Sequence, residues 1–262
     1  MALPPPTLDS AVLVTGASSG IGAELARELA GRGHNVVLAA RRADRLAALA
    51  EELRLAHGVR AEPAAVDLAD ATARDALAEG LLGGELEIVG VCNNAGFGST
   101  GAFHALDRGR EVEQVRVNVE ALHALTGAFL PRMVSHGIGA VLNVASVAGF
   151  QPVPGMATYA ATKAFVIAFS EAVHTELEGT GVSVTCVCPG PVPTEFGEVA
   201  GFTVGGPRAV DARTVARDAV AAMVEGRRSL VPGRANRLMA AGGRVVPRSV
   251  YLPLARRFGR AR

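Results

Sequence analysis

The stretch Thr15-Gly16-Ala17-Ser18-Ser19-Gly20-Ile21-Gly22 decides the fold, because it joins a short apolar run to the start of a helix-like segment. The run before it, Ala11–Thr15, has the apolar character of a buried strand, and residues 20–31 after it are rich in Ala and Leu. Three glycines permit a tight turn and a close approach of the backbone to a ligand. The helix that follows presents unpaired N–H groups and the positive end of its dipole, which suits a pyrophosphate.

A glycine-rich turn can also simply connect a strand to a helix, so the segments around it decide whether it is a ligand-binding loop. This turn follows the first strand and opens the first helix, which is the context of a dinucleotide-binding loop. The residues of the loop that we expect to bind the dinucleotide are Gly16, Ser18, Ser19, Gly20, Ile21 and Gly22.

Short apolar runs alternate with longer stretches rich in Ala, Leu and Arg along most of the chain. The expected strands are Ala11–Thr15, Asn35–Ala39, Ala61–Val66, Ile88–Cys92, Ala140–Ala145, Val182–Val187 and a short seventh at Ser229–Val231. The expected helices lie near residues 20–31, 42–57, 70–82, 109–136 and 156–178. Several strands are almost wholly apolar, as in parallel sheets with helices on both faces. The pattern predicts an α/β fold with one domain, a Rossmann-like doubly wound parallel sheet of about seven strands that begins in the order 3-2-1-4-5-6.

The end of the second expected strand indicates which dinucleotide binds. NAD sites usually offer a carboxylate there, which bonds the ribose hydroxyls. This chain reads Val37-Leu38-Ala39-Ala40-Arg41-Arg42 instead. Two guanidinium groups can pair with a 2′-phosphate. The alternative is a charged helix start without a ligand, but arginine at that position opposes the helix dipole. Arg41 and Arg42 therefore predict NADP(H) in preference to NAD(H).

Tyr159 and Lys163 stand four residues apart within an expected helix, so their side chains share a face. Lys163 is the single lysine among 26 basic residues, and an amine kept under such a bias suggests chemistry that guanidinium cannot do. A free phenol has a pKa of about 10, and a neighbouring ammonium lowers it. The pair predicts general acid–base catalysis by Tyr159. The alternative is an exposed lysine beside a packing tyrosine.

Further motifs stand in the order and spacing of one known family. They are Asn93-Asn94-Ala95-Gly96, Asn118 in VRVNVEA, Ser146 in NVASVAG, and Pro189-Gly190-Pro191-Val192-Pro193-Thr194. Together with TGASSGIG and YAATK, they make the chain resemble the short-chain dehydrogenase/reductase family over residues 11 to about 230. The resemblance implies hydride transfer between a nicotinamide and a carbonyl or alcohol carbon.

The resemblance also implies a role for each matching residue. Tyr159 would donate a proton to the substrate oxygen, Lys163 would lower the pKa of Tyr159 and bind the nicotinamide ribose, and Ser146 would stabilise the developing alkoxide. Asn118 would position a water that links Lys163 to solvent. The other implied cofactor-binding residues are Asp67, Leu68, Asn94, Ala95, Gly96, Pro189, Gly190, Val192 and Thr194. The alternatives are structural: Ser146 ending a strand, Asn118 bonding only to backbone, and Asp67 capping a helix.

These motifs predict an NADP(H)-dependent oxidoreductase that reduces a ketone, aldehyde or 3-oxoacyl group. The predicted catalytic residues are Asn118, Ser146, Tyr159 and Lys163. Two alternatives stay open, an alcohol dehydrogenase working in the oxidative direction and a catalytically idle NADP(H)-binding regulatory protein. Residues around 97–101, 148–156 and 195–204 are expected to line the substrate pocket, and their small or apolar character predicts a hydrophobic substrate. The histidines show no ligand spacing, so no metal site is predicted.

The 262 residues suit one α/β domain. We expect a flexible N-terminal tail over residues 1–10, a Rossmann-fold catalytic domain over 11–233 and a basic C-terminal extension over 234–262. No apolar run approaches the roughly 18 residues of a membrane span, and the first residues lack the basic and apolar regions of a signal peptide. The three cysteines lie in apolar runs and show no disulfide spacing. A cytoplasmic protein is expected.

The net charge of +1 hides an asymmetry, because residues 227–262 hold ten arginines and no acidic residue. This tail either ends in solvent, binds an acidic partner or an anionic membrane surface, or forms part of an interface in the homodimer or homotetramer that the resemblance implies. No recognition motif accompanies the charge, so nucleic acid is not an expected partner. Residues 189–207, rich in Gly and Pro, are either a mobile lid or a plain surface loop.

Overall fold

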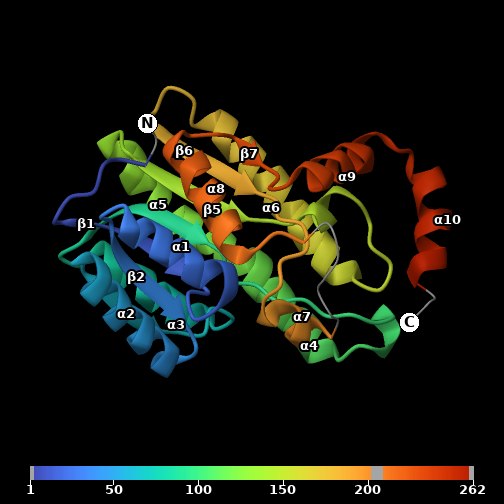
Figure 1. Cartoon of the computed structure of the whole chain (residues 1–262), viewed down its shortest axis with the longest axis horizontal. Helices are drawn as coiled ribbons and strands as arrows, with labels where there is room; N and C mark the ends of the chain where they lie inside the picture. The colour runs from blue at the N-terminus through green and yellow to red at the C-terminus, as the bar shows by residue number, and fades with distance from the viewer. Residues whose placement is uncertain (1–2, 202–208, 260–262) are drawn as a thin grey trace.

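The computed structural model describes residues 3–201 and 209–259. Within these ranges, seven parallel strands form one sheet in the order β3-β2-β1-β4-β5-β6-β7 (Figure 1). The strands are β1 (Ser10–Thr15), β2 (Asn35–Ala40), β3 (Ala61–Ala65), β4 (Glu87–Asn93), β5 (Gly139–Val144), β6 (Val182–Val187) and β7 (Ser229–Leu230). The predicted strand order is confirmed, and the seventh strand extends the sheet beside β6.

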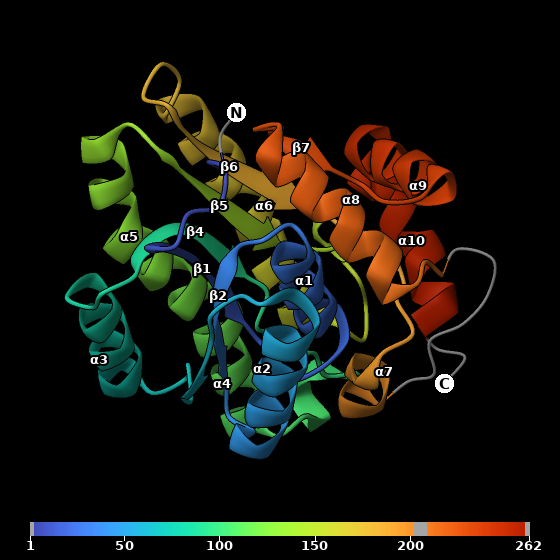
Figure 2. The same cartoon turned by 60° about the vertical axis from the view of Figure 1, so that its left-hand side comes forward.

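Helices cover both faces of the sheet, which confirms the doubly wound fold. Figure 2 shows those of one face together, namely α1 (Gly20–Gly31), α2 (Ala43–His57) and α8 (Ala212–Val224). The helices of the other face are α3 (Ala71–Leu82), α5 (Leu122–His136) and α6 (Ala157–Glu176). Shorter segments that connect these layers are η1 (Phe103–Ala105), η3 (Val147–Phe150) and α7 (Glu195–Ala200). The fold is a single Rossmann-like domain.

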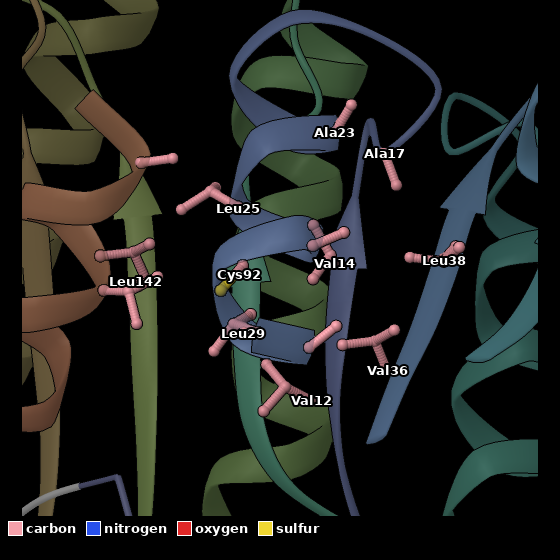
Figure 3. Close-up of a cluster of buried hydrophobic side chains, with 14 of the residues drawn as sticks. Val12, Val14, Ala17, Ala23, Leu25, Leu29, Val36, Leu38, Cys92 and Leu142 are labelled. Atoms are coloured by element: carbon pink, nitrogen blue, oxygen red, sulfur yellow. The ribbon is translucent and has the colours of Figure 1, made fainter. Parts of the chain in front are cut away.

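Residues along β1 alternate between the two faces, because a strand has a period of two. Val12 and Val14 point toward α1, where they share an apolar cluster with Leu25 and Leu29 (Figure 3). Leu13 between them belongs to the cluster on the opposite face. Since both faces are covered, the whole strand is buried. This burial explains why the sequence of the strand is continuously apolar instead of alternating.

The helix expected over residues 109–136 is divided into three helical segments. α4 (Arg108–Val115) leads into η2 (Arg116–Ala121), which is a π-helix, and η2 leads into α5. Such π turns are rare and often occur at functional sites. Asn118, a predicted catalytic residue, lies in this π-helix.

Leu3, Pro4 and Ser10 are buried and residues 5–9 between them are exposed, so part of the segment predicted as a flexible tail over residues 1–10 packs on the sheet. Leu3 is 1% exposed and belongs to the apolar cluster beneath α1. The side-chain amide of Asn35 donates to the Ser10 carbonyl oxygen at 2.9 Å, and β1 already begins at Ser10. Apolar burial and this amide therefore hold the segment against the sheet.

The C-terminal extension folds as two helices, α9 (Arg234–Val245) and α10 (Arg248–Gly259). α9 packs against η3, while α10 stands away from the sheet beyond the end of α9 (Figure 1). Pro247 separates the two helices, whereas Pro253 lies inside α10 and does not end it. Residues 260–262 of the extension lie outside the described ranges. No helix within those ranges has the length and apolar character needed to cross a membrane.

Candidate active site

A cavity of about 870 Å³ opens where β1, β4, β5 and β6 end, at the carboxyl edge of the sheet. Parallel sheets of this type bind ligands at this edge, where the strand order reverses. Nearly all of the residues predicted for the site line the cavity, namely Gly16, Ser18, Ser19, Gly20, Ile21, Arg41, Arg42, Asp67, Leu68, Asn94, Ala95, Gly96, Ser146, Tyr159, Lys163, Pro189, Gly190, Val192 and Thr194. The two exceptions are Gly22 and Asn118, which lie behind the wall.

The glycine-rich loop is held by a backbone that side chains would not permit. Gly16 has a φ of +66°, in the left-handed region that favours glycine. A Cβ on Gly22 would lie 2.2 Å from the Gly16 carbonyl oxygen. Gly22 therefore lets the start of α1 pack directly on the loop, and its role is packing and not contact with the cavity. The N-cap residue Ser19 makes no side-chain capping bond to α1, so the helix start suits an anion in the cavity.

Asn94 joins this loop to the end of β4. Its side-chain amide donates to the Thr15 carbonyl oxygen at 2.9 Å. The hydroxyl of Thr15 accepts hydrogen bonds from the backbone N–H groups of Asn94 and Ala95, at 2.9 and 3.0 Å. These bonds fix the distance between the two strand ends that form the floor of the cavity.

Asp67 lines the cavity and also holds its own loop, because its Oδ1 accepts from the Ala69 N–H at 3.0 Å. The helix that follows is capped by Asp70, whose side chain accepts from the Ala73 N–H. The structural alternative of Asp67 as a helix cap is therefore wrong. Leu68 beside it is buried at 5% exposure.

Arg42 forms the positively charged rim of the cavity. Its Nε and Nη2 donate to the Ser18 hydroxyl at 3.1 and 2.9 Å, and Nη2 also donates to the Ser19 hydroxyl at 2.8 Å. A guanidinium beside two hydroxyls is a donor set that fits a phosphate. Arg41 also lines the cavity but bonds to a different residue of the lining, since its Nη1 donates to Glu113 at 3.2 Å and its side chain is largely exposed. The two arginines are thus not equivalent.

Glu195 and Arg45 complete this rim, and neither was predicted as a cofactor-site residue. Arg42 Nη1 donates to Glu195 Oε2 at 2.8 Å, while Arg45 donates to the other carboxylate oxygen. Bonds from Arg45 and then Arg42 lower the pKa of Glu195 to about 2. Glu195 and Arg42 are 153 residues apart, and no spacing rule connects them. The only local sign of this rim in the sequence was Arg45, a further positive charge three positions after Arg42.

Tyr159, Lys163 and Ser146 meet deeper in the cavity, each with 9% exposure or less. Lys163 Nζ lies 5.8 Å from the centre of the Tyr159 ring and donates to the Val144 carbonyl oxygen at 2.7 Å. Burial lowers the pKa of Lys163 to about 8. Burial also raises the pKa of Tyr159 to about 12, against a smaller opposite effect of its hydrogen bond with Ser146.

The pKa of Tyr159 is therefore raised in this structure and not lowered as expected. The reason is desolvation, which penalises the phenolate, while the ammonium of Lys163 turns to a backbone carbonyl. Tyr159 and Lys163 do share one face of α6, as their spacing predicted. The shared face brings the pair together, but the proton remains firmly on the phenol.

Asn118 positions the loop that carries Phe97. Its amide donates to the Phe97 carbonyl oxygen at 3.0 Å and to the Thr162 hydroxyl at 3.1 Å, and its Oδ1 accepts from the Phe97 N–H at 3.1 Å. Bonding to backbone alone, the structural alternative, is wrong because of Thr162. The water relay predicted for Asn118 stays a prediction.

The inner end of the cavity is apolar. The side chains there come from segments far apart in the sequence: Phe97, Val147, Ala148, Val153, Met156, Phe196, Val199 and Met239. Most fall in the segments predicted to line the substrate pocket, although residues 202–204 lie outside the described ranges, as do residues 202–207 of the predicted lid. Met239 on α9 was not predicted. The ring centres of Phe196 and Tyr159 are 5.3 Å apart, so this apolar end adjoins the phenol.

The model for the short chain dehydrogenase family matches residues 10–201. The chain belongs to this family. Sulfoacetaldehyde reductase 2 of Chromohalobacter salexigens is 38% identical over 187 residues, which are 71% of this chain and 73% of that relative. A short-chain dehydrogenase from Sphingobium yanoikuyae in complex with NADPH is 34% identical with a TM-score of 0.82, covering 97% of this chain and 98% of its own.

Short-chain dehydrogenases with either cofactor are similar to this chain. One from Burkholderia phymatum, in complex with NAD, is 25% identical with a TM-score of 0.80, covering 89% of this chain and 92% of its own. As a member of the family, the protein is an oxidoreductase. The part of the chain that the structure describes holds no cluster of three His, Cys, Asp or Glu residues placed to bind a metal ion.

Proposed function

We propose that this short-chain dehydrogenase reduces a hydrophobic ketone, aldehyde or 3-oxoacyl group to an alcohol, with NADPH as the cofactor. The observation that carries the proposal is one continuous cavity with a guanidinium and two hydroxyls at its rim and a buried Tyr–Lys–Ser group beside an apolar inner end. The rim of that cavity suits a phosphate-bearing ligand, and its inner end suits an apolar one.

The residues at the rim fit NADP(H). Arg42, Ser18 and Ser19 would hold the 2′-phosphate, because a guanidinium and two hydroxyls that can each donate lie together at the rim. The glycine-rich loop and the start of α1 would hold the pyrophosphate. Asp67 and Leu68 would flank the adenine. When bound, the reduced nicotinamide supplies a hydride.

The proton comes from Tyr159. With a pKa of about 12, the phenol keeps its proton at neutral pH and donates it to the substrate oxygen. The Ser146 hydroxyl bonds the same oxygen and stabilises negative charge on it. Lys163, with a pKa of about 8, is charged at neutral pH. Its ammonium stabilises the phenolate that remains after the proton has left.

The substrate class follows from the apolar inner end. Sulfoacetaldehyde, the substrate in the name of one relative, carries a sulfonate that needs a cation. Among the described residues that line the cavity, the arginines stand at the rim and Lys163 is turned to the Val144 carbonyl oxygen. The inner end offers side chains such as Val153, Met156 and Phe196. Such a lining favours a hydrophobic carbonyl compound over a sulfonated one.

A screen of NADPH oxidation tests the proposal, with hydrophobic ketones, aldehydes, steroids and 3-oxoacyl thioesters, repeated with NADH. We expect turnover with NADPH and a fall in kcat of about 10²- to 10⁴-fold in Tyr159→Phe. The other tyrosine of the chain, Tyr251 on α10, gives a matched control, because Tyr251→Phe removes the same hydroxyl from a residue that does not line the cavity.

Three results would contradict the proposal. Wild-type turnover in Tyr159→Phe would mean that another group donates the proton. Binding of NADPH without turnover on any carbonyl would favour a regulatory NADP(H)-binding protein. Turnover with alcohols and NADP⁺ at a much higher rate than the reverse would favour the oxidative direction.

A further inference from the structure

Glu195 is an anion built into the rim where a 2′-phosphate would bind. Its carboxylate contacts both Arg42 and Arg45, and all three side chains are only partly exposed, at 39% to 45%. The other edge of the Arg42 guanidinium is occupied by the hydroxyls of Ser18 and Ser19. Both edges of this guanidinium are therefore engaged within the protein itself.

We infer that Glu195 competes with the 2′-phosphate of NADP(H) for Arg42 and thereby couples the binding of that phosphate to the position of α7. The inference rests on the proposed function, because it takes NADP(H) as the cofactor. It assigns to Glu195 the role of a positioning residue that responds to the phosphate.

Arg42 is bonded to Ser18, Ser19 and Glu195, and the chemistry of these three groups decides which of them gives up its contact when a phosphate binds. A guanidinium has five N–H donors, and a phosphate takes two of them side by side. The hydroxyls of Ser18 and Ser19 can rotate and donate to the phosphate, so they can stay. A carboxylate accepts only, and two anions on one guanidinium repel each other. Glu195 is therefore the group that leaves Arg42, and Arg45 remains as its partner.

The position of Glu195 links its release from Arg42 to the catalytic end of the cavity. Glu195 is the first residue of α7, and the next residue, Phe196, lies against the ring of Tyr159. The other end of α7 is held separately, because Arg110 on α4 donates to the Val199 carbonyl oxygen at 2.7 Å. When Glu195 leaves Arg42, the end of α7 that bears Phe196 loosens while the Val199 end stays attached.

The ligand 2′,5′-ADP tests the competition, because it carries the 2′-phosphate and lacks the nicotinamide. We expect Glu195→Gln to bind 2′,5′-ADP about three- to fivefold more tightly than the wild type, since partly exposed ion pairs are worth little more. The affinity for 5′-AMP should not change. Glu198→Gln, an exposed acid in the same helix, should leave both affinities as they are. Isothermal titration calorimetry measures the wild type and both variants.

Hydrogen exchange of the α7 amides tests the coupling. In the wild type, 2′,5′-ADP should speed exchange in residues 195–200 relative to 5′-AMP. In Glu195→Gln, α7 should exchange fast without ligand and respond to neither nucleotide. Unchanged or weaker binding of 2′,5′-ADP by Glu195→Gln would overturn the competition, and exchange in α7 that ignores 2′,5′-ADP would overturn the coupling.

The failure of the inference and that of the proposed function are distinguishable. If the wild type turns over with NADPH but Glu195→Gln gains no affinity for 2′,5′-ADP, only the inference is wrong. If neither protein binds 2′,5′-ADP better than 5′-AMP, the NADP(H) assignment fails and the inference fails with it.

Discussion

The two ends of the cavity are built from different materials. The end that would hold the cofactor consists mostly of backbone and short side chains in the loops that follow β1 to β4, with Arg42 and Glu195 at its rim. The apolar inner end consists of side chains from η3, α7, α9 and the loops that carry Phe97, Val153 and Met156, which meet only because the whole domain packs. The cofactor end is therefore set by local turns, whereas the apolar end depends on the packing of the whole domain.

The largest effect expected on stability comes from filling the backbone contact at the cofactor end. Gly22→Ala places a methyl group 2.2 Å from the Gly16 carbonyl oxygen, so we expect a loss of about 1–3 kcal/mol in the free energy of unfolding together with weaker binding of NADPH. Urea denaturation measures the loss. Gly80→Ala, in the exposed part of α3 with no atom within 4 Å of the new methyl, should instead stabilise the protein by about 0.5–1 kcal/mol.

If Gly22→Ala bound NADPH with wild-type affinity and kept its stability, the cofactor end would be more plastic than its close contacts indicate. The comparison between a rigid rim and a packed inner end would then be broken.

The pH dependence sharpens the comparison where the two ends meet. The pKa of Lys163 is lowered to about 8, whereas that of Tyr159 is raised to about 12. Between pH 7 and 10 the phenol keeps its proton and the ammonium loses its own, so kcat/KM for reduction should fall as the pH rises through about 8. A profile that stays flat up to pH 10 would show that the charge of Lys163 does not assist the proton transfer.

The same shift affects stability with a definite sign. The pKa of Lys163 in the folded protein lies below the value of 10.5 for a free lysine. Between pH 8 and 10 the unfolded chain therefore binds the proton that the folded protein has released. The contribution of Lys163 to the free energy of unfolding should rise with pH over this interval.

The smallest effect is expected at the inner end. Met239→Ala shortens one apolar side chain of several, so the KM for a bulky hydrophobic substrate should rise by about twofold to fivefold, with the KM for NADPH unchanged. Leu238→Ala is the control, because the neighbouring Leu238 is 77% exposed. Steady-state kinetics with a substrate from the screen measures both. Equal effects of the two variants would mean that α9 acts through its general stability.

The cofactor end was predictable because its signals are local. The turn around Gly16 and the charge at Arg42 are each recognised within a few residues. Continuously apolar strands in turn indicate a sheet that is covered on both faces. α8 was missed, although its Ala-rich segment after the N-cap Asp211 carried an ordinary helix signal. The packing of Leu3 and the π-helix around Asn118 had no such local sign.

What could not be predicted depends on contacts across the fold. The pairing of Glu195 with Arg42 needs the loop after β6 to lie over the start of α2. The raised pKa of Tyr159 needs the burial that the surrounding helices create, and a spacing of four residues gives no measure of burial. Met239 reaches the cavity only because α9 packs on η3.

Because η2 is a π-helix, the number of residues in this segment matters as much as their types for the direction in which Asn118 faces. Successive residues of a regular helix are about 100° apart around its axis, so removing one residue from Arg116–Ala121 would rotate the residues on one side of the gap by that angle. Asn118 would then face away from Phe97 or from Thr162, which it now joins. Point substitutions around Asn118 leave this geometry intact, whereas a single codon deletion does not, so relatives aligned with a gap here would carry a differently supported cavity wall.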